Sequence, residues 1–116
     1  TEIASLSADW DSYGARAPVQ AAIDNTRTLL RLVRKATIGR YAQPWAITPL
    51  PNGNIFVEWR STTGAALEVE VGARSRFGYL LITQQGSERQ FTEADDVRWS
   101  TILLLIRNFL ETEFTD

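Results

Sequence analysis

The stretch IFVEWRSTTGAALEVEV, residues 55–71, decides the fold, because two alternating runs of side chains flank a glycine-containing turn. Such alternation predicts two strands that each bury one face. A three-residue loop over 62–64, with its glycine in the left-handed conformation, sets Ser61 opposite Ala65. A loop one residue longer would mix the two faces, so the pattern selects this register. The register gathers six side chains on one buried face: Ile55, Val57, Trp59, Leu67, Val69 and Val71.

The residues on either side of this hairpin predict the other elements of a single α+β domain spanning 1–116. Alternating patterns and turn signals predict strands at 45–50, 55–60, 67–71, 79–85 and, as a short fifth strand, 86–91. Helical spacing of apolar residues predicts helices over 3–13, over 18–38 and from a capping pattern at Thr92 and Asp95 to about Phe114. The expected order is two helices, a four- to five-stranded antiparallel meander packed against helices, and one helix.

The composition excludes several classes of function. The chain has no histidine and no cysteine, and its net charge is −2. Most acid–base, nucleophilic and metal-assisted mechanisms therefore lack their usual groups, and only carboxylate chemistry stays open. We expect no enzyme, no cofactor and no metal. The longest apolar run, 102–106, is too short to span a membrane and no signal segment opens the chain, so we expect a cytoplasmic protein without membrane contact.

The stretch DWDSYGA, residues 9–15, is the first candidate for a contact surface. Trp10 and Tyr13 extend the apolar stripe of the first predicted helix, and Gly14 occupies the position of a C-terminal cap. This pattern is typical of a structural joint held by two anchored rings. Asp11, however, lies in the last helical turn, where the helix dipole disfavours an anion. The alternative is that Trp10, Asp11 and Tyr13 contact a partner.

Three glutamates form the second candidate. In the predicted register Glu58 lies directly opposite Glu68, and Glu70 follows on the same face. Like charges directly opposite each other destabilise a strand pair. Three interpretations stay open: a solvated face neutralised by Arg60 or by another arginine, a docking surface for a basic partner, and a carboxylate pair used for catalysis or for a metal ion.

A basic stripe on the second predicted helix is the third candidate. It consists of Arg27, Arg31, Arg34 and Lys35, which lie on one arc opposite the apolar side of the helix. Such a stripe can follow a row of phosphates, so nucleic-acid binding is an alternative function. A solvated helix face is the simpler interpretation, since basic residues interleaved with aromatic residues on a strand are missing.

The last predicted helix is apolar over more than one face. Its main arc comprises Trp99, Ile102, Leu103, Leu105, Ile106, Phe109 and Leu110. Val97 and Leu104 fall outside this arc, so the helix is either covered from two sides or binds something. Burial against the first helix of the chain is one interpretation. A homodimer or partner interface through Val97 and Leu104 is the other.

Scattered motifs resemble a family of small, uncharacterised bacterial and phage proteins. The likeness covers about the first 70 residues and rests on a W-D-S/G-Y-G-A motif, here Trp10 to Ala15, followed by Pro18, and on a P-x-G-x-x-x-x-E-W hairpin, here Pro51 to Trp59. The LEVEV strand at 67–71 fits the same pattern. Asn54 departs from it, as does VGARSR where an Asp-Gly turn is expected. The resemblance implies one domain type and the strand positions, and it implies no catalytic residues.

These observations together predict a non-enzymatic protein–protein interaction module of bacterial or phage origin. Inhibitors, antitoxin-like proteins and chaperone-like partner proteins belong to this class. Its partner would be another protein, or a second copy of the chain bound through the last helix. Nucleic-acid binding through the basic stripe is the alternative, and a carboxylate-based enzyme that uses Glu58, Glu68 and Glu70 is the third hypothesis.

Overall fold

The computed structural model describes residues 19–37 and 43–113, which form two helices and five strands. The elements in chain order are α1 (Gln20–Ala36), β1 (Ala46–Pro49), β2 (Ile55–Arg60), β3 (Ala66–Val71), β4 (Phe77–Gln85), β5 (Glu88–Val97) and α2 (Trp99–Glu113). The predicted α+β class with an antiparallel meander is confirmed. The helix predicted over 3–13 lies outside the described residues, within which one helix precedes the sheet and one follows it.

The five strands pair in chain order, each antiparallel to the next. The central hairpin has the predicted register, with Trp59 opposite Leu67 and Ile55 opposite Val71. Its loop is closed by the Ser61 amide, which donates to the Ala65 carbonyl at 2.9 Å. Gly64 has a φ of +94°, a conformation that a side chain would strain. The local turn and the alternation of side chains therefore agree, and that agreement fixes the register.

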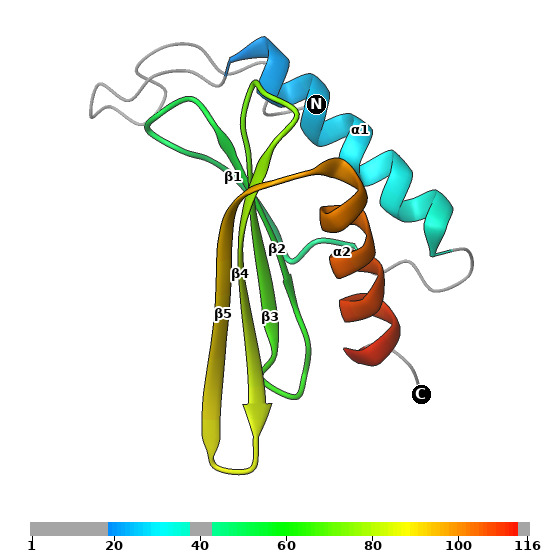
Figure 1. Ribbon diagram of the computed structural model, residues 1–116, viewed down its shortest axis with the longest axis vertical. Helices are drawn as coiled ribbons and strands as arrows, with labels where there is room; N and C mark the ends of the chain where they lie inside the picture. The colour runs from blue at the N-terminus through cyan, green and yellow to red at the C-terminus, as the bar shows by residue number, and fades with distance from the viewer. Residues whose placement is uncertain (1–18, 38–42, 114–116) are drawn as a thin grey trace.

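Both helices pack on the same face of the sheet, where they enclose the core (Figure 1). The inward-facing side chains of β2 and β3 are almost fully buried, and Trp59 is 0% exposed. Burial of each large apolar side chain contributes roughly 1.5–3 kcal/mol, so this layer supplies much of the stability. The largest fully buried side chains are Trp59, Phe77, Leu29, Ile55, Leu67, Ile102, Ile106, Leu110, Val33, Val57, Val69 and Val71.

Helix α1 is held at both ends of its buried side. The amide of Val19, its N-cap residue, donates to the Gly53 carbonyl at 3.0 Å, which ties the helix start to the β1–β2 turn. At the other end, buried Thr37 donates its hydroxyl to the Val33 carbonyl at 2.7 Å. Helical spacing predicts a buried arc made of Val19, Ala22, Ile23, Thr26, Leu30 and Val33. Most of these residues are buried, Val19 and Leu30 are half-buried, and Leu29, at 0% exposed, is an additional member. The opposite arc, which carries the basic stripe, faces outward.

The predicted start of the last helix is wrong. Thr92 and Asp95 belong to β5, which pairs with β4 as far as Val97, and α2 begins only at Trp99. The free edge of β4 offers a ladder of backbone hydrogen bonds, and this tertiary pairing outweighs the local capping signal. A register shift interrupts the ladder between the Tyr79–Ala94 and Phe77–Val97 pairs. The predicted buried side of α2 is confirmed, since Ile102, Ile106, Phe109 and Leu110 are all buried.

Candidate functional site

The face of the sheet turned away from α1 and α2 carries no other helix in the described part of the chain, and we name it the open face (Figure 1). Residues directly opposite each other in an antiparallel ladder point to the same face, so the strand registers fix its membership. The open face consists of Ala46 and Thr48 of β1, Phe56, Glu58 and Arg60 of β2, Ala66, Glu68 and Glu70 of β3, Gly78, Leu80 and Ile82 of β4, and Arg89, Phe91 and Glu93 of β5.

Two carboxylates face each other at the centre of the open face. Glu58 lies directly opposite Glu68, as the sequence predicts. Glu58 is only 6% exposed, and Arg60 Nε donates a hydrogen bond to its Oε2 atom. The guanidinium of Arg60 lies 3.6 Å from the centre of the Trp45 ring, so a cation–π contact holds this arginine in place. The expected neutralisation by Arg60 is therefore present, and it serves Glu58.

Glu68 is the carboxylate that this arrangement leaves unneutralised. Within residues 19–37 and 43–113 it has neither a hydrogen bond nor an ion pair. Its burial among neighbouring side chains raises its pKa, and the charge of Glu58 raises it further, while Arg60 lowers it in part. A half-buried anion without a hydrogen bond or ion pair is costly, because it has lost part of its hydration and the nearby charge of Arg60 offsets that loss only in part. Glu68 is thus the side chain of the open face that gains most from an added positive charge.

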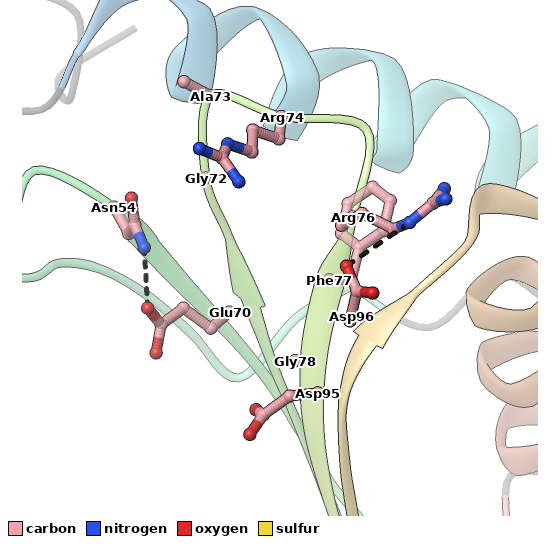
Figure 2. A pocket seen from close by; sticks show the side chains of 10 residues that line it. All are labelled: Asn54, Glu70, Gly72, Ala73, Arg74, Arg76, Phe77, Gly78, Asp95 and Asp96. Carbon is pink, nitrogen blue, oxygen red and sulfur yellow. Dashed lines mark hydrogen bonds and ion pairs between the residues drawn. The ribbon is translucent and has the colours of Figure 1, made fainter.

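Glu70 lies at the rim of a hollow of about 420 Å³ at one end of the sheet (Figure 2). Its Oε2 atom accepts hydrogen bonds from the side-chain amides of Asn54 at 2.7 Å and Asn52 at 3.3 Å. On the opposite rim Arg76 Nε lies 3.3 Å from Asp96 Oδ1. The polar groups of this hollow are thus largely engaged with one another, which makes it a weak candidate for a ligand site.

Asp95 joins the open face through a glycine. A Cβ atom added at Gly78 would lie 3.1 Å from Asp95 Oδ1, so the carboxylate of Asp95 rests on the space that the missing side chain leaves. A second, smaller hollow of about 180 Å³ lies next to Glu68. It is lined by this carboxylate and by the half-buried side chains of Phe56 and Leu80. Apolar surface and carboxylates therefore alternate across the middle of the face.

The described residues contain no group of three or more carboxylates or other metal-binding side chains arranged to hold a metal ion. The metal interpretation of Glu58, Glu68 and Glu70 therefore has no geometric support in this part of the chain. Glu58 is 6% exposed and its Oε2 atom already accepts a hydrogen bond from Arg60, so little of this carboxylate is accessible to a substrate. The arrangement suits binding of a cationic and partly apolar surface.

The proposed surface of Val97 and Leu104 is wrong in its predicted form. Val97 ends β5 opposite Phe77, inside the core, where it is 9% exposed. It is buried because β5 continues to this residue, so Val97 lies on a strand and does not share a helix face with Leu104. Leu104 itself is 55% exposed on the outer side of α2. A homodimer through the last helix would therefore rest on Leu104 without its predicted neighbour.

The basic stripe does not join the open face, and the first candidate surface cannot be placed relative to it. Trp10, Asp11 and Tyr13 lie outside the described residues. The members of the basic stripe are exposed on the outer side of α1, which packs over the opposite face of the sheet: Arg27, Arg31, Arg34 and Lys35.

The sequence predicts strands over 45–50 and 86–91, but it does not predict that Trp45 and Phe91 border the open face. Phe91 is 61% exposed and Trp45 is 60% exposed, and both are large aromatic rings at its borders. The sequence predicts a helix over Glu93 and Asp95, so it does not predict that these two residues lie beside the other carboxylates. A signal for the edge position was available, because charged side chains as frequent as those of residues 88–96 are typical of an edge strand.

None of the helices within the described ranges is long and apolar enough to cross a membrane. No protein-family model matches the chain, and no curated protein or solved structure is significantly similar to it.

Proposed function

We propose that this domain is a non-enzymatic protein-binding module that binds its partner on the open face of the sheet. The observation that carries the proposal is Glu68, a half-buried carboxylate at the centre of the open face, which has no ionic partner among the described residues. An arginine or lysine of a bound protein would supply the missing charge, and exclusion of water would strengthen that hydrogen bond.

The charge of the open face agrees with a basic partner. Its carboxylates are Glu58, Glu68, Glu70, Glu93 and Asp95, and its cations are Arg60 and Arg89. Five acids against two arginines leave a local charge of 2 − 5 = −3, which attracts cationic surfaces and repels phosphates. The repulsion of phosphates argues against nucleic acid on this face.

The apolar surface of the open face supplies the second part of the binding chemistry. Phe56 and Leu80 are half-buried. The exposed rings of Trp45 and Phe91 flank them at the two edges of the sheet, beside β1 and on β5. Protein interfaces combine an apolar, aromatic centre with a polar rim and a few desolvated charges. A partner segment with basic and apolar residues in alternation would match this pattern.

Affinity capture with a charge-reversed variant tests the proposal. Glu68→Arg replaces the like-charge pair with an opposite-charge pair, so we expect the folded domain to be retained and the partner to be lost from nuclease-treated lysate. Glu88→Arg is the matched control, because it makes the same charge change at the exposed tip of the β4–β5 hairpin. Equal recovery of the same partner with both variants would reject the open face as the binding site.

The basic stripe of α1 supports a second candidate, nucleic-acid binding. All four of its members are exposed, although Arg34 and Lys35 also suit the last turn of a helix, where cations stabilise the helix dipole. If the stripe binds phosphates, retention on heparin falls steeply with salt, and Arg31→Glu weakens it. Passage through heparin at low salt without retention would remove this candidate.

A further inference from the structure

Strand β5 is a long edge strand. It runs over ten residues from Glu88 to Val97 and pairs with β4 on one side, and within the described ranges no strand pairs with its other side (Figure 1). Such an edge presents a row of unpaired backbone N–H and C=O groups. The opposite edge is different, since β1 has four residues and includes Pro49, which cannot donate to a ladder. Only β5 therefore offers an edge suited to pairing.

The pairing of β5 with a second copy of itself is restricted by symmetry. In an antiparallel ladder, hydrogen-bonded and non-hydrogen-bonded residue pairs alternate. A two-fold axis must relate each pair to an equivalent pair, so it has to pass between a residue and the same residue of the other copy. Each admissible register is therefore defined by one central residue.

Most of these central residues bring like charges together. A centre at Glu88, Arg89 or Glu93 sets that charge against itself. A centre at Ala94 sets Glu93 against Asp95, and centres at Gln90 or Thr92 set Phe91 against a charged side chain. Like charges directly opposite each other destabilise a strand pair, so the registers centred on Glu88, Arg89, Glu93 and Ala94 are disfavoured. The registers centred on Gln90 and Thr92 bring no like charges together near the axis, but they place the Phe91 ring opposite Arg89 or Glu93 instead of opposite the second ring.

The register centred on Phe91 matches every charged side chain near the axis. Arg89 of each copy faces Glu93 of the other, so two opposite-charge pairs flank the axis, and Gln90 faces Thr92. The two Phe91 rings meet at the axis, on the same face as Arg89 and Glu93. The Arg89 guanidinium lies 5.8 Å from the centre of the Phe91 ring of its own chain, so the charged and aromatic groups of the proposed contact are adjacent in the single chain.

We propose that two copies of this chain pair through β5, antiparallel and centred on Phe91, to form one continuous sheet. The pairing explains why Phe91 is 61% exposed in the single chain, because the second ring covers it. The ladder covers Glu88 to Ala94 and ends at the register shift, where Asp96 has a φ of 59°. Since the axis is perpendicular to the sheet, the two open faces lie side by side. This assembly does not depend on the proposed function.

A charge-swap series in analytical ultracentrifugation tests the proposal. We expect the wild type to approach a mass of about 2 × 13.0 = 26 kDa as its concentration rises. Arg89→Glu and Glu93→Arg each turn both opposite-charge pairs into like-charge pairs. The association constant of the dimer should therefore fall on the order of tenfold in each variant. The doubly swapped variant, with Arg89→Glu and Glu93→Arg in one chain, restores both pairs and should dimerise like the wild type.

Mixing the two single variants gives the most specific result. A chain with Arg89→Glu carries two acids at these positions and a chain with Glu93→Arg carries two bases, so we expect a one-to-one heterodimer that forms more readily than the dimer of either variant alone. Glu88→Arg is the control, since Glu88 faces uncharged Ala94 in this register and should leave the dimer intact. Circular dichroism confirms that each variant is folded.

Three results would overturn the proposal. One is a wild type that stays at 13.0 kDa at every concentration. Another is a dimer that both single charge reversals leave unchanged but Leu104→Asp dissolves, which would assign the contact to α2. The third is a mixture of the two single variants that remains monomeric while both are folded.

Discussion

Removal of the unneutralised charge at Glu68 should stabilise the domain. Glu68→Gln keeps the shape of the side chain and abolishes its repulsion with Glu58, which lies directly opposite. A like-charge pair across two strands costs about 0.2–1 kcal/mol, and relief of the partial burial of the charge acts in the same direction. For a domain of this size that gain corresponds to roughly 1–4 °C in Tm. Most single substitutions destabilise a protein, so a gain is diagnostic.

The gain should depend on pH in a defined way. Burial raises the pKa of Glu68 above its ordinary value of 4.5, and the charge of Glu58 raises it further. A group whose pKa is raised in the folded state contributes stability below its unfolded pKa and loses it as the pH rises through the folded pKa. The difference between Glu68→Gln and the wild type should therefore be largest at neutral pH and vanish as the pH falls to about 4.5.

Urea denaturation at several pH values measures this difference directly. Glu88→Gln is the matched control, because Glu88 is exposed and lies opposite Gln85 at the tip of its hairpin, so its neutralisation should change stability little. A Glu68→Gln variant that is less stable than the wild type at pH 7 would refute the reasoning, because it would show that Glu68 gains more from its surroundings than it loses. A gain that persists unchanged below pH 4 would also refute it, since the carboxyl is then protonated.

Three further substitutions test the core and the turn by urea denaturation. Val97→Asp should cost about 3–5 kcal/mol, because it buries an unpaired charge, whereas Leu104→Asp on the exposed side of α2 should change stability by about 0.5 kcal/mol or less. Similar effects of the two would contradict the burial of Val97. Trp59→Ala should cost about 3–5 kcal/mol, and a smaller loss would mean that the core collapses around the cavity. Gly64→Ala should cost about 1–3 kcal/mol through its φ of +94°, and a neutral effect would contradict the turn geometry.

The sequence predicts the central hairpin and its carboxylate pair because several local signals agree there. Turn length, the glycine conformation and the alternation of side chains all select one register, which sets Glu58 opposite Glu68. It does not predict which carboxylate is neutralised. That outcome depends on Trp45, which lies outside the hairpin and holds Arg60 toward Glu58 by its ring. Contacts between segments of this kind leave no periodic signal.

The wrong prediction of a helix from Thr92 onward, in the second half of β5, has a different physical cause. The segment FTEADDV, residues 91–97, has no alternating pattern, and its Thr92 and Asp95 imitate a helix cap. It forms a strand because β4 supplies a ladder along its whole length, so the strand is specified by its neighbour more than by its own residues. In this segment the local charge pattern favours a helix, whereas pairing with β4 favours a strand. Its charged residues contribute to neither the core nor a turn.

Such conflicts between local preference and final structure concentrate where a protein does something besides fold. An edge strand that only needed protection would be short, or would carry charges that no register could pair. In β5 the charges disfavour the registers centred on Glu88, Arg89, Glu93 and Ala94, whereas in the register centred on Phe91 Arg89 meets Glu93 and the two Phe91 rings meet. The part of β5 that the sequence predicts as a strand, up to Phe91, and the part that it assigns to a helix, from Thr92 on, are therefore both explained by a second copy of the chain, since that copy completes the pairing that β4 begins.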